Sequence, residues 1–521
     1  MIAARRSSDR LPRGLLAVCV AVAALAFTPV VITVVQALQG GASAAGHVLT
    51  NHSTPGLLLR TAAAALLATP LCAIFGVGSA WLIERTRLPG RRIWTVLLVA
   101  PLVVPVFVTG YAYANLSGTL QGFWGAVAIL AFSYYPVVFL LVSASMRVLD
   151  PALEETARSL GLGGWATFRR VVLPQIRPAL YGGLLLVLLS GLVEYDAFVA
   201  FHYQTFTIDI YSQYRLSFSA SGAAALSGLS ILLCLAILVC EALLRGGANY
   251  TKIGSGSRRP ATRVRLGRST LPALVGMVAL VGIALGVPVG MLVYWWSNAS
   301  AAGHAAARAE LHYLGPAALT SVLMGLASAV LATILALPLA VLAVRHNGPV
   351  VTALERSVYV AFALPDLVAA IALAYGATRL VPSLYGTVFL MVLAEALLFL
   401  PFALVALRTT LGLIEPALEE SARALGLGPL RTLWRVTIPL ARPGLGAAAV
   451  LVFAFTLGDL STAQVLLPPG MDSLGVHFDA DARTVSFAAA VPYGAVMVAI
   501  AMAATFVLVT QFGRVRGLEA R

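Results

Sequence analysis

The sequence predicts an all-α membrane protein of twelve transmembrane helices, arranged as two parallel six-helix repeats. Three observations lead to this fold class. The 521-residue chain is 60% hydrophobic and only 11% charged, whereas soluble globular proteins carry about 25% charged residues. It contains twelve apolar stretches long enough to cross a bilayer. A polar stretch between two of these spans occurs twice, beginning at Glu154 and again at Glu419, 265 positions later.

The apolar stretches are the expected spans, because about 20 apolar residues cross the hydrocarbon core as a helix. Several contain proline or glycine, which spans tolerate where neighbouring helices re-satisfy the backbone. The first follows an arginine-rich start, but its apolar run exceeds the roughly 7–15 residues of a signal peptide, so we expect a retained span. In order, the expected spans are 14–38, 58–83, 93–115, 123–146, 179–201, 224–244, 270–296, 317–344, 357–378, 384–407, 444–467 and 488–512.

The basic residues sort to one side of these spans. With the N-terminus placed in the cytoplasm, 30 of the 35 lysines and arginines fall in inside segments. Such a bias is typical of cytoplasmic loops. We therefore expect both termini in the cytoplasm, and the net charge of +14 needs no nucleic acid as a partner. Only five arginines remain for the outside: Arg60, Arg215, Arg308, Arg379 and Arg483.

A basic linker over residues 246–269 divides the chain into a first half, 1–245, and a second half, 270–521. Each half holds six expected spans, and an even number gives both halves the same orientation. Gly161 and Gly426 are in register at the 265-residue offset, as are Pro174 and Pro439. Transporters with parallel repeats of this kind carry their pathway between the repeats. A duplication without a pathway is the alternative.

The duplicated stretch reads EETARSLGLGGWATFRRVVLP in the first half and EESARALGLGPLRTLWRVTIP in the second. Leu153, Ala157 and Leu160 form an apolar stripe at helical spacing. Gly161 is a suitable C-terminal stop, and a second short helix is expected to end at Pro174 or its counterpart. A small amphipathic helix on an inner face can lie on lipid or dock in the groove of a partner protein.

Both copies resemble the EAA loop of ABC import permeases, which reads Glu-Ala-Ala, three residues, Gly, nine residues, Ile-x-Leu-Pro. Thr156 and Ser421 replace the first alanine, and Ile438 replaces leucine. The resemblance covers essentially the whole chain and implies the type I ABC importer permease fold, because the family includes fused permeases of two halves. It implies coupling to an ATPase through Glu155, Ala157, Gly161, Leu173, Pro174, Glu420, Ala422, Gly426, Ile438 and Pro439.

The resemblance also implies partners. The chain contains no G-x-x-x-x-G-K-[ST] motif, so ATP hydrolysis would reside in two copies of a separate cytoplasmic ABC ATPase subunit. An extracytoplasmic substrate-binding protein would dock on the outer loops, 202–223 and 468–487. We expect a permease subunit rather than an enzyme, with no cofactor and no resident metal, in the plasma membrane of a prokaryote.

Acidic residues inside spans are costly and are functional candidates. Glu194 and Asp459 are in register at the same offset, about 24 Å from the inner face at 1.5 Å per residue. With Asp196 they could line a translocation pathway for a cation. They could equally cap broken helices or pair with arginine. Asp366 and Glu395 are further buried acids, and we expect a structural role for Glu395.

The sequence around these acids narrows the resemblance. EYDAFVAFHYQTFTIDIY (194–211) and GDLSTAQVLLPPGMDSLGV (458–476) resemble stretches of ferric-iron transport permeases. This implies ferric iron as the cargo, with thiamine or another small solute as the alternative. An ion-coupled secondary transporter would explain twelve spans and buried acids, but not the two polar loops. A membrane receptor or scaffold would not need matched acids in both halves.

Overall fold

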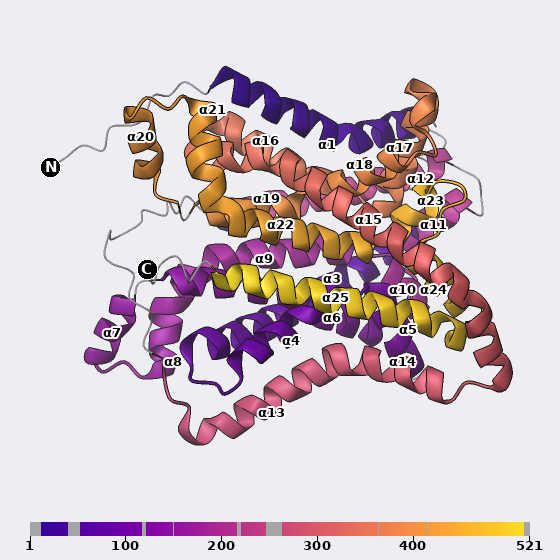
Figure 1. The fold of residues 1–521 in the computed structure, drawn as a ribbon, viewed down its shortest axis with the longest axis horizontal. Helices are drawn as coiled ribbons and strands as arrows, with labels where there is room; N and C mark the ends of the chain where they lie inside the picture. Colours follow the sequence, from indigo (N-terminus) through magenta and orange to yellow (C-terminus); the bar gives the residue numbers. More distant parts are fainter. Residues whose placement is uncertain are drawn as a thin grey trace.

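The computed structural model describes residues 12–39, 53–116, 121–149, 151–215, 220–245, 263–362, 364–412 and 414–514. Within these ranges the chain is almost entirely helical, and the only β-type pairing is one isolated bridge between Thr86 and Val264 (Figure 1). The all-α prediction is confirmed. Residues 246–262 of the expected linker and residues 216–219 of an expected outer loop lie outside the described ranges.

The described part of the first half begins with a long helix, and two of its expected spans, 93–115 and 179–201, are interrupted. Its polar loop forms short helices that lead directly into the fifth span. Its helices are α1 (Arg13–Gln39), α3 (Ser53–Arg85), α4 (Arg91–Val103), α5 (Val106–Leu116), α6 (Phe123–Val148), α7 (Pro151–Ser159), α8 (Gly164–Thr167), α9 (Leu173–Val193), α10 (Asp196–Ala200), α11 (Phe206–Arg215) and α12 (Ala220–Arg245).

The second half repeats this order. Its helices are α13 (Thr270–Val281), α14 (Val287–Ser297), α15 (Ala301–Arg345), α16 (Pro349–Phe362), α17 (Asp366–Leu380), α18 (Val388–Leu398), α19 (Leu400–Leu411), α20 (Pro416–Ala424), α21 (Pro429–Thr432), α22 (Ile438–Leu457), α23 (Leu460–Leu466), α24 (Leu474–Arg483) and α25 (Phe487–Arg514).

Each of the twelve expected spans falls on an apolar helix or on a bent pair of helices. In the described residues, six helices are long and apolar enough to cross a membrane singly, five bent pairs qualify together, and Gly222–Ile237 is a shorter apolar helix. Helix α15 exceeds its expected span, 317–344. Its 45 residues measure about 67 Å, roughly twice the hydrocarbon thickness, so its N-terminal part extends beyond the membrane.

Two expected spans are sharply broken rather than continuous. The span expected at 93–115 consists of α4 and α5, which meet at 92°, and the span expected at 357–378 consists of α16 and α17, which meet at 99°. Pro105 and Pro365 stand at the two breaks. Proline lacks an amide hydrogen and pushes the preceding residue out of the helical region, which explains where the helices stop.

The prediction that a short helix ends at Pro174 or Pro439 is wrong. Wide π-helical turns, Phe168–Val172 and Leu433–Thr437, precede these prolines, and the chain continues as helix through both. A π turn gives the proline ring the room that a regular α turn denies it. The chain bends instead a few residues later, by 63° in each half.

The first helix of each half packs against the opposite half. Helix α1 runs along α16 and α17 of the second half, and α14 lies against α5 of the first half (Figure 1). Helices α7 and α20 both lie at one end of the molecule, apart from each other, and α11 and α24 lie at the other end (Figure 1). We call these the α7/α20 end and the α11/α24 end. The exchange of first helices binds the halves into one body.

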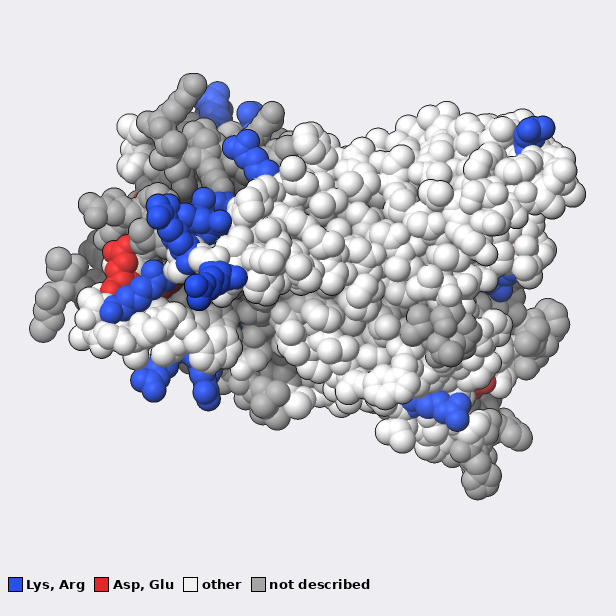
Figure 2. All heavy atoms as spheres, turned by 90° about the horizontal axis from the view of Figure 1, so that it is seen from below, with Lys and Arg blue, Asp and Glu red and all other residues white. Residues whose placement is uncertain are grey.

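Charge divides the surface along the same axis. In the face seen in Figure 2, lysine and arginine side chains gather at the α7/α20 end, a broad band in the middle is almost free of charged groups, and only a few charges occur at the other end. A band without charge, covered by apolar side chains, is what the hydrocarbon core of a bilayer requires. The molecular long axis is therefore close to the membrane normal.

Close packing of α3 on α6 generates the first prediction. A Cβ atom added at Gly76 would lie 2.7 Å from Val138 Cβ and 2.9 Å from the Phe139 amide nitrogen, whereas one added at Gly78 meets nothing within 4 Å. We expect Gly76→Ala to lower the unfolding free energy by about 1–3 kcal/mol through overpacking. Thermal unfolding of the detergent-purified protein measures this, with Gly78→Ala as the control. Equal midpoints for both variants would contradict the packing.

Candidate functional site

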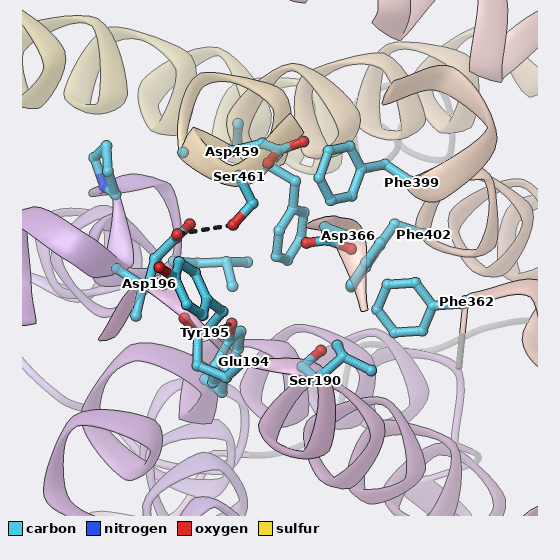
Figure 3. Close-up of a pocket in the computed structure, with 18 of the residues that line it drawn as sticks. Ser190, Glu194, Tyr195, Asp196, Phe362, Asp366, Phe399, Phe402, Asp459 and Ser461 are labelled. Carbon is cyan, nitrogen blue, oxygen red and sulfur yellow. Dashed lines mark hydrogen bonds between the residues drawn. The ribbon is translucent and has the colours of Figure 1, made fainter. Parts of the chain in front are cut away.

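A pocket lies between the two halves, where four helices are interrupted (Figure 3). The junctions α4/α5, α9/α10, α16/α17 and α22/α23 all contribute to its wall. The lining residues are Leu102, Val104, Pro105, Val106, Tyr134, Ser190, Val193, Glu194, Tyr195, Asp196, Phe362, Asp366, Leu367, Phe399, Phe402, Ala454, Phe455, Gly458, Asp459 and Ser461. The three predicted pathway acids are thus brought to one place.

Glu194 and Asp459 occupy the same position in the two halves. The amide of Ala197 donates to Glu194 Oε1 at 3.0 Å, and the amide of Thr462 donates to Asp459 Oδ1 at 3.0 Å. Each carboxylate therefore satisfies the first turn of the short helix that follows it. Of the two structural roles that the sequence left open, helix capping is the one found.

The remaining oxygens of these two carboxylates differ. The Tyr134 hydroxyl donates to Glu194 Oε2 at 2.6 Å, whereas Asp459 Oδ2 is buried and has no hydrogen-bond partner. Asp366 Oδ1 is also buried without a partner. Beside the pocket, Asp459 and Asp366 thus each keep one carboxylate oxygen without a hydrogen-bond donor among the described residues. Such oxygens can bind a cation or a polar ligand.

The two halves meet at a contact between matched positions. The hydroxyl of Ser461 donates to Asp196 Oδ1 at 2.8 Å, and these residues are 265 positions apart (Figure 3). Equivalent residues of a two-fold arrangement touch each other only close to the symmetry axis. The pseudo-two-fold axis that relates the halves therefore passes through this contact and beside the pocket.

The sequence analysis named Asp366 as buried but did not place it in the pathway. Asp366 is the first residue of α17, and it shares the pocket with Glu194, Asp196 and Asp459 (Figure 3). The preceding Pro365 stands at the break, but proline inside a span can also be accommodated in a bent helix, so it is only a weak signal. Glu395 is different: it does not line the pocket, it is buried in α18, and it accepts a hydrogen bond from Ser328 at 2.7 Å.

The pocket has one aromatic wall. Phe455 stacks on Phe402 and Phe399 with ring centroids 4.0 and 5.7 Å away, and Phe362 meets Phe402 edge-on at 5.4 Å. All four come from the second half. At the 265-residue offset, Tyr134 stands where the second half has Phe399, and Ser190 where it has Phe455. The first half therefore supplies a more polar wall.

The electrostatic character of the pocket is acidic. Four carboxylic acids line it, and no lysine, arginine or histidine is among the lining residues in the described part of the chain. The described residues contain no group of three or more histidine, cysteine, aspartate or glutamate side chains that could hold a metal ion. The acids are thus spread around the pocket rather than gathered into a tight chelating site.

The duplicated polar loops lie at the α7/α20 end and share one geometry. The amide of Leu162 bonds the Ala157 carbonyl at 3.1 Å, and the amide of Gly161 bonds the Arg158 carbonyl at 3.0 Å. Gly161 has φ +85° and Gly426 has φ +88°, with the same two bonds in the second copy. This is a Schellman ending, in which glycine takes the left-handed conformation. The expected helix stop at Gly161 is confirmed.

The two glutamates that open each loop point in different directions. Glu155 and Glu420 are exposed, whereas Glu154 and Glu419 are buried against the helix bundle. Ala157 and Ala422 are also buried, and Leu173, Pro174, Ile438 and Pro439 are half-buried. The sequence pattern identified the exposed glutamates and gave no role to the buried pair.

Apolar side chains stand out from both loops. Leu160 is 78% exposed and Leu425 is 85% exposed. Leu153, Leu418, Trp165 and Leu430 are exposed beside them. An apolar surface at the charged end of a membrane protein, outside the uncharged band, is typical of a protein-binding site.

At the α11/α24 end, α24 closes against the first half. The Tyr111 hydroxyl of α5 donates to Asp479 Oδ1 at 3.1 Å, and Arg483 donates to Asp479 Oδ2 at 2.6 Å. His477 lies between the rings of Tyr313 and Tyr493, with centroids 5.5 and 4.9 Å away. The loop expected at 468–487 therefore contains a helix, α24, that packs on the first half.

A family model matches the chain twice, over residues 73–245 and 329–515. The family is described as the binding-protein-dependent transport system inner membrane component. Each match covers one of the two repeats, which agrees with the duplication predicted from the polar loops.

Individual relatives are transport permeases. The chain is 30% identical over 481 residues to the Fe(3+)-transport system permease protein FbpB 2 of Haemophilus influenzae, covering 92% of this chain and 94% of the relative. It is 20% identical over 459 residues to the ferric transport system permease protein FbpB of Actinobacillus pleuropneumoniae, covering 82% and 67%. It is 31% identical over 206 residues to the sulfate transport system permease protein CysT of Escherichia coli, covering 36% and 72%.

The setting of Asp481 on α24 generates a pH prediction. Burial, and then the nearby Glu310, raise the pKa of Asp481 from 3.8 to about 6, against an opposing effect of His477. The folded state thus binds the proton of Asp481 more tightly than the unfolded chain does. The stability that this proton provides is therefore lost as the pH rises from about 3.8 to about 6. We expect Asp481→Asn to gain more stability over the natural protein at about pH 7.5, above both values, than at about pH 4.5, near the lower end of the window. Thermal unfolding at both pH values measures this, and an equal difference at both would contradict it.

Proposed function

The chain belongs to the family of binding-protein-dependent transport system inner membrane components, and we propose that it is the permease subunit of an ABC importer that carries ferric iron into the cytoplasm. It is a multi-pass membrane transport protein rather than an enzyme, as its relatives are named permeases. The cargo would arrive on an external binding protein, and the energy would come from ATP hydrolysed by a separate subunit.

The acidic pocket is the observation that carries the choice of a cationic cargo. Glu194, Asp196, Asp366 and Asp459 line it from both halves, without a basic side chain among the described lining residues. Clefts lined by charge of one sign attract ligands of the other sign. The acids are dispersed rather than chelating, which suits a pathway, since conduction requires binding weak enough for release. The ferric-iron relative that aligns over 92% of the chain supports the same cargo.

The distribution of charge supports the orientation. Lysine and arginine gather at the α7/α20 end (Figure 2), and an excess of basic residues marks the cytoplasmic side. The α7/α20 end would then face the cytoplasm, with both termini on that side of a prokaryotic plasma membrane. The halves would be residues 1–245 and 270–521, joined by a cytoplasmic linker, 246–269.

The two polar loops would be the docking sites for two copies of an ABC ATPase. Each presents an exposed glutamate, Glu155 or Glu420, beside an exposed leucine, Leu160 or Leu425. Two like helices related by the axis through the pocket fit a partner that is itself two-fold. A binding protein would meet the α11/α24 end, where α24 and the N-terminal part of α15 stand.

The mechanism follows from two bundles that meet around a central axis. Closure of the ATPase pair would draw α7 and α20 together, and the two halves would rock about the pocket, which would open in turn to each side. The carboxylates of the pocket would replace part of the hydration of the cation while it crosses. The exchanged helices α1 and α14 would keep the halves in contact during this movement.

A second candidate cargo is an organic cation such as thiamine. The aromatic wall of Phe362, Phe399, Phe402 and Phe455, in the same pocket as the acids, favours it, because a cation gains free energy over an aromatic face. Ferric iron would make no use of this wall. Uptake of both cargoes must therefore be measured side by side.

Removal of two pocket charges tests the cargo. We expect Asp196→Asn combined with Asp366→Asn to slow ferric-iron uptake at least about tenfold, since each contact to a charged group contributes about 1.5–3 kcal/mol. Neither carboxylate caps a helix, so the fold should survive. Uptake by proteoliposomes that hold the complete importer measures this, with Glu395→Gln as the control because that buried acid lies outside the pocket. Unchanged iron uptake with reduced thiamine uptake would instead select the organic cation.

Charge placed on the exposed leucines tests the docking site. We expect Leu160→Glu combined with Leu425→Glu to weaken ATPase binding about tenfold or more, since buried apolar anchors at interfaces contribute more than about 1 kcal/mol each. Co-purification of the ATPase with the permease measures this. Leu380→Glu, at an equally exposed leucine on α17, is the control. Full ATPase recovery with the double variant would exclude these loops as the docking site.

A further inference from the structure

The buried glutamates of the two polar loops pair with the last residues of two long membrane helices. Arg85 ends α3, and its Nε lies 2.8 Å from Glu154 Oε1. Arg345 ends α15, and its guanidinium donates to Glu419 Oε1 at 2.8 Å. We call these the two anchoring pairs. They join α7 to α3 and α20 to α15 in the same way.

Each arginine also holds the backbone that enters its loop. Arg85 donates to the Met146 carbonyl at 2.8 Å, and Arg345 donates to the Ile414 carbonyl at 3.2 Å. One side chain thus fixes both the chain that leads into the short helix and the short helix itself. The recurrence of this double contact in both halves indicates that it is not an accident of local packing.

The anchoring pairs are shielded from solvent. The side chains of Arg85 and Glu154 are 3% and 7% exposed, and those of Arg345 and Glu419 are 15% and 9% exposed. A buried charge that loses its partner is strongly unfavourable, so these pairs resist separation. By contrast, Arg158 and Arg423, which contact the same glutamates at 3.5 and 3.8 Å, are 34% and 56% exposed. Exposed pairs of this kind contribute little.

The two copies are reinforced differently. In the second half the Thr437 hydroxyl donates to Glu419 Oε1 at 3.0 Å, and Val172 stands at the matching position of the first half. In the first half the end of the linker adds a contact, because the Val264 amide donates to the Arg85 carbonyl at 2.9 Å. Both additions hold the anchoring pair in place, and neither reaches the exposed face of the loop.

Given the proposed function, on which this inference rests, we propose that the two anchoring pairs transmit the movement of α7 and α20 to the membrane helices. The flanking segments that also connect each short helix to the bundle include Gly161 and Gly163 or their counterparts, and glycine gives a segment little stiffness of its own. With the pair intact, α7 moves with the end of α3, and α20 with the end of α15. Arg85, Glu154, Arg345 and Glu419 are therefore positioning residues, which act through the helices they join.

Spin-label distances test this without dependence on the cargo. The complex of permease and ATPase would carry labels in two sets, on a background with the exposed Cys240 replaced by serine. One set, at the exposed Ser159 and Ala424, which end α7 and α20, reports the movement of the loops and leaves the docking leucines in place. The other, at Leu59 of α3 and Leu319 of α15, which are exposed, reports the movement of the membrane helices. Distances are recorded with and without ATP.

In the natural protein we expect ATP to change both distances. In Glu154→Gln combined with Glu419→Gln, the Ser159–Ala424 distance should still change, because the exposed docking face is intact, while the Leu59–Leu319 change falls at least about twofold. In Arg158→Gln combined with Arg423→Gln, both changes should persist. A full change at Leu59 and Leu319 in the glutamate variant would overturn the proposal, and so would an equal loss in the arginine variant.

Failure of the proposed function itself has a different signature, since the natural protein would then show no ATP-dependent change at the loop labels. A role in folding alone also differs, because it would lower the yield of the complex but leave the movement of the surviving complex unchanged. If the double variant does not assemble, Glu154→Gln and Glu419→Gln are tested singly, each with one anchoring pair intact. Natural-like movement in both single variants would overturn the proposal.

Discussion

The architecture depends on one constraint, the need of every backbone amide and carbonyl within a bilayer for a hydrogen-bond partner. A helix can stop at membrane depth only where protein surrounds the open end. In the described residues the junctions α4/α5, α9/α10, α16/α17 and α22/α23 are such stops, and all four line the same pocket. Glu194 and Asp459 then supply acceptors to the helices that restart beyond two of these stops. The pocket and two of its four acids, Glu194 and Asp459, are thus consequences of a single requirement.

Duplication explains why the stops converge. Because Asp196 and Ser461 touch across the interface at matched positions, the axis between the halves passes through the pocket, and each interruption in one half faces its counterpart. The same axis relates α7 to α20 at the far end of the molecule. A movement that is symmetric at the loops is therefore symmetric at the pocket, provided that the connecting helices remain rigid.

Much of this organisation could be predicted from the sequence, because hydropathy, basic residues and the repeat are local signals. The breaks at Pro105 and Pro365 could not be predicted from the sequence, because proline inside a span can also be accommodated in a bent helix. Pro174 shows this: a π turn carries the helix through it. The burial of Glu154 beside the exposed Glu155 depends on Arg85, which lies 69 positions earlier, and no local pattern reveals that distant partner.

The repeat also separates the acids that the fold requires from those that it does not. Glu194 and Asp459 stand at matched positions and make the same capping bond, so an acceptor is needed there whatever the cargo. Asp196 matches Ser461 in the second half. At the two proline breaks, Asp366 is the first residue of α17, whereas Val106 is the first residue of α5. The fold is therefore satisfied without a carboxylate at either position. Since a sulfate permease shares part of the same sequence at 31% identity, the scaffold alone cannot select a cation, and Asp196 and Asp366 are the side chains best placed to do so.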